Sequence, residues 1–503
     1  MDLLIGLDVG TTATKALLFD RQGSIVAAAS QSYGLVTPQE GWVEQDAEEL
    51  WRAVVAVLQA VVAQASAHDR IVALSQSSQG GTTIPVDAHG IPTHNAISWM
   101  DQRARDQAQQ VSRTWGAERI YVTTGWPLQD GLPLQHIAWL KANRPQVFAA
   151  TRRFAFVNDW ITYRLTGQWC MNPSDASITQ LMDIAKADWD DRLLGAAGIG
   201  HDQLSPVRPS TAPIGPLTEQ ASNAVGLPRD LLVVNGAHDQ YCAAVGAGVT
   251  RPGPVLLSCG TAWVILAVPE DLPLGLGSGL AVSCHAISGR WGAIRSLGGV
   301  GTSMEWFLDQ IWSRQDMQAK PEALYVILSQ HVLKSPPGAD GLLFYPLAGG
   351  HTRALSTRRG GFVNLSLSHS RGDMARAVME GTAFELRWTM EEIQGQAIHV
   401  TELKMVGGAA QSAAWPQIVA DITGIPVVLP GCRQAASRGA AILAGVGCGL
   451  FADPEAGWAA FEGQPRRLEP AAANRALYDA LLADYKGIWE CLTVQGFAAR
   501  TRP

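Results

Sequence analysis

The sequence predicts an α/β protein of at least two domains, built around a strand–turn–strand unit that occurs twice. The chain has 503 residues, and one domain usually takes about 100–200 residues. Apolar runs at residues 3–7 and 16–19 flank a Gly-Thr turn, and the same pattern returns at residues 255–268 near the middle of the chain. Predicted strands and helices then alternate, which is typical of an α/β architecture. The repeated hairpin indicates a duplicated domain.

The first half of the chain is expected to continue from its opening hairpin with a strand and a helix. That helix begins at Asp46, has acidic residues in its first turn, and carries apolar residues at helical spacing. A strand, a long aromatic-rich insertion and a buried strand come next. The predicted ranges are 24–30 (strand), 46–61 (helix), 71–74 (strand), 100–230 (insertion) and 231–234 (strand).

The second half is expected to begin near residue 248, which gives predicted domains of residues 1–247 and 248–503. Its last part alternates helices and strands at 373–392, 403–406, 415–422, 427–429 and 435–445. The last of these helices is rich in small residues, which predicts close packing on a sheet.

Composition disfavours several classes of function. Net charge is −7, hydrophobic residues make up 47% of the chain and charged residues 17%. There is no long basic run, so nucleic acid and anionic membranes are not expected as partners. No apolar stretch reaches the roughly 18 residues that span a bilayer. The seven cysteines are scattered without a Cys-x-x-Cys pair, which favours reduced thiols and a cytoplasmic location.

The opening hairpin has the residues of a phosphate site. Its turn contains Gly10, Thr11 and Thr12, which supply backbone N–H groups and hydroxyls. Lys15 adds a cation, and Asp8 adds a carboxylate that could hold Mg²⁺ directly or through water. The alternative is an ordinary N-terminal hairpin.

The second hairpin repeats the turn with Gly260 and Thr261. Two such turns facing each other would hold a polyphosphate from both sides. The chain has no Gly-x-x-x-x-Gly-Lys-Ser/Thr segment, so a P-loop is excluded.

Asp239 is the leading candidate for catalysis. It follows a buried strand and Gly236, where α/β folds present groups to ligands. Transfer of a phosphoryl group to an alcohol needs a carboxylate that orients the hydroxyl and accepts its proton. A carboxylate in this position is also often only a helix N-cap, and the residues alone leave both interpretations open. The neighbouring His238 could tune the pKa of Asp239 or bond to the backbone.

Two further polar segments follow predicted strands. Gly407 and Gly408 allow close approach of the backbone to a flat ligand, although a plain strand-to-helix turn also often contains this pair. Trp99, Asp101 and Arg103 form a cluster in which the last two are expected on one side of an extended strand. The alternative for that pair is a surface ion pair, which would contribute little to stability.

Several motifs in a fixed order resemble the FGGY family of carbohydrate kinases over nearly the whole chain. They are the segments 6–12, 133–141, 236–240, 360–381 and 407–409. The resemblance implies a two-domain actin-like ATPase fold (ribonuclease H-like), with the active site in the cleft between the domains. It also implies ATP and Mg²⁺, and it favours Asp239 as the general base.

The resemblance assigns further residues to ligands. The nucleotide is expected at the Gly407–Gly408 turn with Ala409 and Gln411. The small-molecule sugar is expected at Gln79, Trp99, Asp101, Arg103, Asp239 and Gln240.

The sugar itself is less well defined by the motifs. The segment Ser78-Gln79-Gly80-Gly81-Thr82-Thr83 lacks the Met and His typical of xylulose-specific members and the Arg and Glu typical of glycerol-specific ones. His136 stands where a Lys is usual. We expect phosphorylation of a ketopentose such as xylulose. The alternatives are gluconate, another ketose or polyol, and an actin- or chaperone-like ATPase without a sugar substrate. A homodimer is left open.

Overall fold

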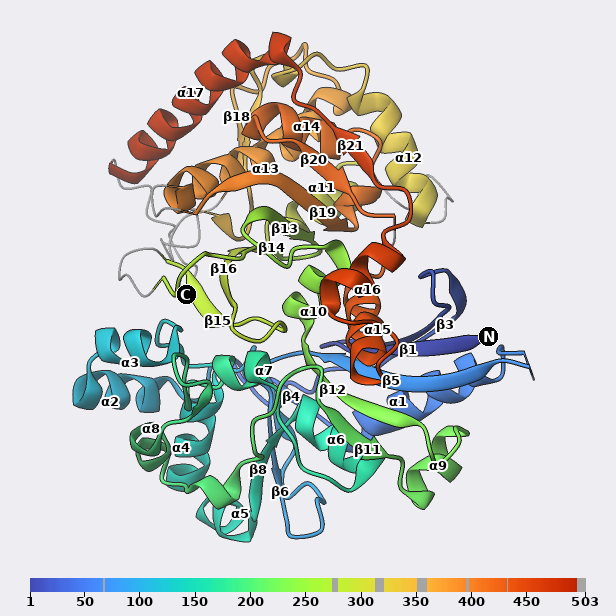
Figure 1. The fold of residues 1–503 in the computed structure, drawn as a ribbon. Helices are drawn as coiled ribbons and strands as arrows, with labels where there is room; N and C mark the ends of the chain where they lie inside the picture. The colour runs from blue at the N-terminus through green and yellow to red at the C-terminus, as the bar shows by residue number, and fades with distance from the viewer. Residues whose placement is uncertain are drawn as a thin grey trace. The chain divides into compact units, whose positions relative to one another are not determined.

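Figure 1 shows the fold in a computed structural model that describes residues 1–66, 68–273, 279–312, 321–350, 360–394, 398–431 and 433–494. The chain forms two units. Unit 1 consists of Met1–Arg251, Val268–Ile294 and Gln434–Gly463, and unit 2 of Pro252–Ala267, Arg295–Arg433 and Gln464–Pro503. The predicted boundary at residues 247 and 248 lies just before the first passage into unit 2, and two later segments belong to unit 1.

Unit 1 is built on a six-stranded sheet with the order β11-β12-β5-β1-β2-β3. Its strands are β1 (Asp2–Val9), β2 (Ala13–Phe19), β3 (Ile25–Ser32), β5 (Arg70–Ser78), β11 (Pro213–Pro216) and β12 (Leu232–His238). The predicted opening hairpin is confirmed, because β1 and β2 pair antiparallel as far as Val9 opposite Thr14. Strands β1, β5 and β12 run parallel to one another. Their carboxyl ends therefore meet at one edge of the sheet.

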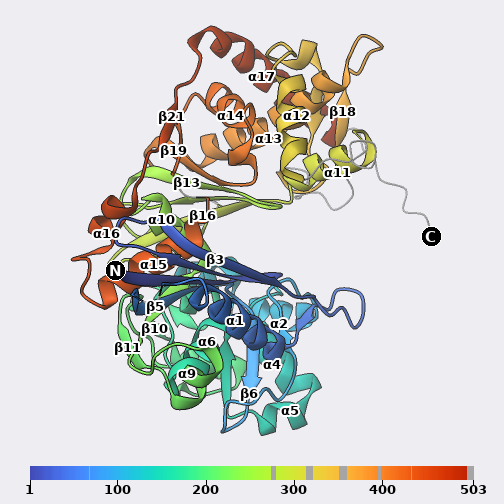
Figure 2. The same ribbon diagram turned by 90° about the vertical axis from the view of Figure 1, so that its right-hand side faces the viewer.

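Helices cover both faces of this sheet (Figure 2). Helix α1 (Ala47–Val62) begins after Asp46, whose side chain accepts a hydrogen bond from the Glu48 N–H, as the acidic start predicted. Its buried face packs with Ile5 and Leu7 of β1. Gly6 faces the opposite side, because side chains alternate along a strand.

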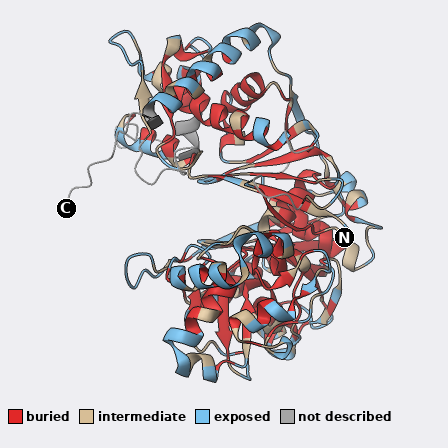
Figure 3. Ribbon diagram, turned by 90° about the vertical axis from the view of Figure 1, so that its left-hand side faces the viewer, coloured by how far each residue is buried: buried red, intermediate tan, exposed pale blue. Residues whose placement is uncertain are grey.

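Helix α15 (Ala435–Gly447) packs against β1 and β5 on the side of Gly6. A Cβ atom on Gly6 would lie 1.8 Å from the Ser437 carbonyl oxygen, so only glycine permits this approach. Helix α10 (Asp239–Ala247) packs against α15 equally closely, since a Cβ on Gly439 would lie 1.8 Å from the Cys242 carbonyl oxygen. The prediction of close packing by the small-residue helix is confirmed, and Figure 3 shows the interior of the unit as buried.

Much of the insertion forms a second core within unit 1, which Ile97, Val282 and Cys284 join from outside it. Trp160 and Val225 of the insertion belong to the first core instead. A four-stranded sheet has the order β4-β7-β6-β8, from β4 (Glu44–Gln45), β6 (Thr83–Val86), β7 (Ala96–Ile97) and β8 (Arg153–Phe156). The helices are α2 (Arg105–Trp115), α3 (Ala117–Thr124), α4 (Pro133–Asn143), α5 (Pro145–Ala150), α6 (Val157–Thr166), α7 (Pro173–Ile178), α8 (Asp191–Ala197) and α9 (Glu219–Val225). The remaining elements of the unit are β9 (Met182–Asp183), β10 (Asp188–Trp189), β15 (Ala281–Cys284), the first half of β16 (Trp291–Gly298) and α16 (Pro454–Phe461).

Unit 2 repeats the hairpin followed by parallel strands. Its sheet contains the order β14-β13-β19-β20-β21, with β13 (Gly253–Cys259), β14 (Trp263–Ala267), β19 (Val400–Gly407), β20 (Val427–Leu429) and β21 (Arg466–Leu468). Strands β13 and β14 form the predicted second hairpin, and β13, β19 and β20 run parallel. The order β14-β13-β19-β20 repeats β2-β1-β5-β12 of unit 1. This repeat agrees with the duplication that the sequence indicated.

Helices α11 (Thr302–Gln310), α12 (Pro321–Val332), α13 (Arg371–Gln394), α14 (Trp415–Thr423) and α17 (Arg475–Val494) complete unit 2, with the short pair β17 (Leu343–Tyr345) and β18 (Gly361–Val363). The helices predicted at 373–392 and 415–422 are confirmed. Among the described helices, none is both long and apolar enough to cross a membrane.

Candidate active site

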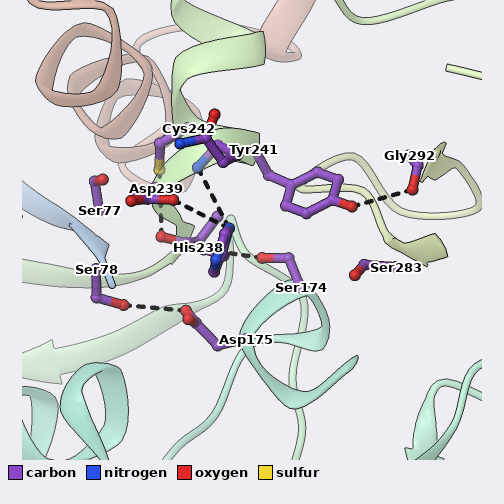
Figure 4. A network of polar contacts seen from close by, with 12 residues as sticks. Ser77, Ser78, Ser174, Asp175, His238, Asp239, Tyr241, Cys242, Ser283 and Gly292 are labelled. Carbon is purple, nitrogen blue, oxygen red and sulfur yellow. Dashed lines mark hydrogen bonds and ion pairs between the residues drawn. The ribbon is translucent and has the colours of Figure 1, made fainter. Parts of the chain in front are cut away.

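Three parallel strands of unit 1 end side by side and bring their last residues together. In the register, Asp8 on β1 lies opposite Ser77 on β5, and Ser78 lies opposite His238 on β12. Asp239 follows directly as the first residue of α10. Figure 4 shows the polar network at these strand ends. Predicted site residues that are more than 200 positions apart in the sequence therefore belong to one cluster.

Asp239 is positioned by the junction of β12 and α10. The N-cap of α10 is His238, whose Nδ1 accepts a hydrogen bond from the Gln240 N–H at 3.3 Å. The interpretation of Asp239 as the helix cap is therefore wrong, because its neighbour has that role. About a third of the Asp239 side chain is exposed (34%), and Oδ1 lies 3.3 Å from His238 Nδ1. The carboxylate is thus free to meet a ligand.

Asp8 faces the same cluster. Its Oδ1 accepts a hydrogen bond from the Ser77 hydroxyl at 2.8 Å, and Lys15 is its cross-strand partner on β2. Burial raises the pKa of Asp8 to about 6, the Ser77 hydrogen bond acts to lower it, and the negative charge of Asp239 raises it. A nearby cation would stabilise the charged form of this carboxylate.

The donor set around Asp8 fits one kind of metal site. Within the described ranges, no group of three or more His, Cys, Asp or Glu residues is arranged to hold a metal ion. Mg²⁺ beside phosphates commonly keeps several waters and takes only one or two protein carboxylates. Asp8 therefore fits a Mg²⁺ ion that is held mainly by a nucleotide, and it does not fit a metal site made by the protein alone.

The Gly10–Thr12 turn is tied to the predicted sugar segment. The indole N–H of Trp99, which is 45% exposed, donates to the Thr11 hydroxyl at 3.1 Å. The Thr11 carbonyl accepts from the Gln45 amide at 2.8 Å, and Gln79 Nε2 donates to Gln45 Oε1 at 3.0 Å. Gln79 is only 3% exposed. It supports the turn through Gln45, while a direct contact of Gln79 with a sugar stays a prediction.

Asp101 and Arg103 differ from what the sequence suggested. They lie in the turn between β7 and α2, so the predicted extended strand is wrong. They are also not a surface pair, since both side chains are 0% exposed and Arg103 Nη2 lies 2.9 Å from Asp101 Oδ2. The guanidinium also pairs with Glu44 at 2.8 Å and stacks on Trp42 at 3.8 Å. This buried network fixes the loop that carries Trp99 and does not present a free cation.

Asp175 is a member of the cluster to which sequence analysis gave no role. It lies on α7, accepts hydrogen bonds from Ser78 Oγ at 3.1 Å and Asn172 Nδ2 at 2.7 Å, and is buried. Burial raises its pKa well above the usual range, and the charge of Asp239 adds to the shift. The adjacent Ser174 hydroxyl accepts from the His238 backbone N–H at 3.0 Å. The available signal was the run of serines that ends β5, whose hydroxyls bind both Asp8 and Asp175.

Two more predicted positions have distinct environments. The Gln240 side-chain oxygen is buried and has no hydrogen-bond partner among the described residues, so a hydroxyl donor from a ligand would satisfy it. His136, in contrast, is a core residue of α4. It is fully buried, its Nδ1 is 3.1 Å from the Thr83 hydroxyl, and burial lowers its pKa to about 3. A neutral histidine therefore replaces the usual lysine there.

In unit 2, the two glycine turns assigned to the nucleotide lie at adjacent strand ends. Strands β13 and β19 are parallel, with Cys259 opposite Gly407. Gly407 has φ +93°, and a Cβ there would lie 2.5 Å from the Cys259 carbonyl oxygen. Among the atoms that the structure describes, none would lie closer than 3.7 Å to a Cβ at Gly260 or 3.9 Å to one at Gly408. The fold therefore requires glycine at 407, whereas 260 and 408 leave open space in front of the backbone.

The remaining predicted residues of this region lie beside those turns. Thr261 is exposed in the hairpin turn, and Ala409 and Gln411 belong to a single 3₁₀ turn, Ala409–Gln411, with the Gln411 side chain exposed. The segment before α11 was missed by sequence analysis. Its Gly301 N–H donates to the Thr261 carbonyl at 3.1 Å, and a Cβ on Gly301 would lie 2.3 Å from the Gly260 carbonyl oxygen. The start of α11 therefore supports the hairpin turn.

Comparison with known families agrees with this arrangement. Residues 3–246 match the N-terminal domain of the FGGY family of carbohydrate kinases, and residues 255–448 match its C-terminal domain. The chain belongs to this family. It is a carbohydrate kinase, and ATP is the substrate that such an enzyme shares with other kinases. The prediction of a two-domain actin-like ATPase fold is confirmed by the same comparison and by the solved structures of relatives.

Individual FGGY relatives are similar over most of their length. A xylulose kinase of Staphylococcus epidermidis is 29% identical over 492 residues, covering 97% of each chain. A gluconokinase of Bacillus subtilis is 29% identical over 458 residues, covering 89% of this chain and 87% of the relative. The crystal structure of ligand-bound xylulose kinase from Lactobacillus acidophilus superposes with a TM-score of 0.88 at 26% identity, covering 98% of this chain and 99% of the other.

Proposed function

We propose that this FGGY kinase transfers the γ-phosphoryl group of ATP to a hydroxyl of a ketopentose such as xylulose, with Mg²⁺ as the metal. The observation that supports this proposal most is the partly exposed carboxylate of Asp239, held by α10 beside Asp8 at the ends of three parallel strands. Ligands in open α/β sheets bind at such carboxyl ends. Xylulose is favoured by the similarity to xylulose kinases over 97% of the chain.

In the proposed reaction, Asp239 orients the acceptor hydroxyl and takes its proton as the hydroxyl attacks the phosphoryl group. The unsatisfied oxygen of Gln240 accepts a hydrogen bond from another sugar hydroxyl. Asp8, held by the Ser77 hydroxyl, would hold the Mg²⁺ that neutralises charge on the phosphates. Thr11, Thr12 and Lys15 are proposed phosphate contacts in unit 1.

Unit 2 is proposed to bind the nucleotide through Gly260, Thr261, Gly408 and Gln411. The open space in front of Gly260 and Gly408 supports this proposal, because no contact with a described residue requires glycine at either position. Gly407 serves the same turn by allowing β19 to approach Cys259. Whether both hairpin turns act on one phosphate chain in a cleft stays a prediction, as do the cytoplasmic location and a homodimer.

Replacing Gly260 with Val is expected to raise the KM for ATP by about 10-fold or more while the sugar KM changes little, since loss of one backbone contact removes ground-state binding. The side chain would project into open space, so the melting temperature should stay near that of the wild type. Steady-state kinetics with each substrate varied in turn measure this split.

Gly407→Ala is the matched control for Gly260→Val, because its Cβ would strike the Cys259 carbonyl and its φ is positive. We expect this variant to lose thermal stability. If Gly260→Val moves only the sugar KM, the assignment of this turn to the nucleotide is wrong.

Charge at the site favours a neutral sugar over an aldonate. The carboxylate of Asp239 is partly exposed, Lys15 lies opposite Asp8, and the Arg103 guanidinium is buried between Asp101 and Glu44. A gluconate carboxylate would thus approach the Asp239 carboxylate, and the buried Arg103 is already paired with Asp101 and Glu44, so the approach costs binding energy. Gluconate remains the second candidate because a gluconokinase is also 29% identical.

The proposed substrate is tested by measuring kcat/KM for xylulose, other ketoses, polyols and gluconate in a coupled ADP-release assay. We expect xylulose to exceed gluconate by roughly 10²-fold or more, which is within the discrimination that an unpaired buried charge supports. A higher kcat/KM for gluconate than for xylulose would show that the substrate is the aldonate and not a ketopentose. ADP release that no sugar increases would contradict a sugar substrate altogether.

A further inference from the structure

His238 occupies a position that the proposed reaction does not yet use. It caps α10, and its ring is held from several sides. Nδ1 accepts from the Gln240 N–H, the backbone N–H donates to the Ser174 hydroxyl, and the ring meets the edge of Tyr241 with centroids 5.7 Å apart. Histidine is not a usual N-cap residue. The imidazole is therefore held in one orientation directly beside Asp239.

Two contacts of Nδ1 bear on which nitrogen of His238 carries the proton. When Nδ1 accepts from the Gln240 N–H, the proton of the neutral ring is on Nε2. Nδ1 also lies 3.3 Å from Asp239 Oδ1, and a proton on Nδ1 would point to that carboxylate instead. Burial lowers the pKa of His238, although the nearby charge of Asp239 acts to raise it. Nε2 has no hydrogen-bond partner among the described residues, while 9% of the side chain is exposed. In the tautomer with Nδ1 accepting from Gln240, an N–H donor is thus available next to the carboxylate.

Gly80 provides the space for this ring. A Cβ on Gly80 would lie 2.3 Å from His238 Cδ2 and 2.8 Å from Nε2, closer than atoms can approach. Unlike Gly81, whose φ is +76°, Gly80 does not have a positive φ, so its backbone alone would accept another residue. The reason for glycine at position 80 is therefore the packing against His238, and the methyl group of Ile178 at 2.9 Å is a lesser obstacle at a side-chain end.

We propose that Gly80 and His238 form a matched pair that determines acceptor specificity, in which Nε2–H of His238 donates a hydrogen bond to a sugar oxygen next to the hydroxyl that Asp239 activates. The inference rests on the proposed function. A neutral N–H donor selects sugars that have an oxygen at that position. Any side chain at position 80 would displace the His238 ring and with it the donor. Gly80 acts as a positioning residue through His238.

A double-mutant cycle of wild type, Gly80→Ala, His238→Ala and the double variant tests the pair. Each single change is expected to raise the sugar KM by roughly 5- to 20-fold, the usual effect of one lost hydrogen bond, and to leave the ATP KM unchanged. The double variant should match His238→Ala, because the ring that Gly80→Ala displaces is already absent. Thermal melting is measured in parallel, and the double variant should melt at the temperature of His238→Ala, without a further loss from Gly80→Ala.

His238→Asn separates substrate contact from helix capping. Asparagine caps helices well, so stability should be kept, but its shorter side chain cannot place a donor where Nε2 lies. We expect the sugar KM of this variant to equal that of His238→Ala. A wild-type sugar KM in His238→Asn, or additive effects in the cycle, would overturn the inference. Absence of sugar phosphorylation by the wild type would overturn the proposed function and this inference together, so the two failures are distinguishable.

Discussion

Replacing Asp239 with Asn is expected to lower kcat on the best sugar by about 10²–10⁴-fold, the usual range for loss of a general base. The amide has nearly the same shape as the carboxylate but cannot accept the proton of the sugar hydroxyl. Because His238, and not Asp239, caps α10, the fold does not depend on this carboxylate for the start of the helix. The variant should therefore keep its melting temperature and its affinity for ATP.

The matched control for this change is Asp202→Asn, which alters a carboxylate that is 71% exposed and pairs with Arg152 at the surface of unit 1. Its kcat should equal that of the wild type. ATP affinity of both variants is measured by equilibrium titration with a fluorescent nucleotide. A wild-type kcat in Asp239→Asn would show that Asp239 is not the general base. A loss of both kcat and ATP affinity in this variant would indicate a structural role for Asp239.

Replacing Asp8 with Asn is expected to lower kcat by roughly 10²–10³-fold, because a correctly placed Mg²⁺ contributes several kcal/mol of charge stabilisation in the transition state. The loss should be accompanied by a higher Mg²⁺ concentration for half-maximal rate. The sugar KM should remain near the wild-type value. Rates are measured as a function of free Mg²⁺ at saturating ATP and sugar.

Ser77→Ala is the graded comparison for Asp8→Asn. It removes only the hydroxyl that donates to Asp8 Oδ1 at 2.8 Å, and loss of such a supporting group typically costs about 10–100-fold in metal affinity or activity. We expect a smaller shift in the same direction. If neither variant changes the Mg²⁺ dependence, Asp8 does not hold the metal.

The fold was predictable from the sequence where local patterns and the family motifs agreed. The two hairpins, the capped helix after Asp46 and the small-residue helix α15 were expected and are observed. The duplication was predictable because the sequence contains two hairpins with similar turns. In the structure each hairpin begins the same strand order. The assignment of Gln434–Gly463 to unit 1 was not predictable, since it depends on contacts between α15 and strands that lie more than 350 residues earlier.

The candidate site was predictable in its strand ends but not in its side-chain environment. Residues at the ends of β1 and β12 were found because a polar residue after a buried strand is visible in the sequence. The burial of Asp101 and Arg103 was not, because the same Asp-x-Arg spacing occurs on surfaces and in cores. Asp175 and the Gly80–His238 pair depend on contacts between distant segments, and no local pattern shows which glycine makes room for which ring.

The most direct test of the central claim is identification of the product formed from ATP, Mg²⁺ and xylulose. We expect ³¹P NMR and mass spectrometry to show a pentulose phosphate that accumulates in step with ADP and is absent with Asp239→Asn. Release of inorganic phosphate in place of a sugar phosphate, or an equal yield from Asp239→Asn, would contradict the account.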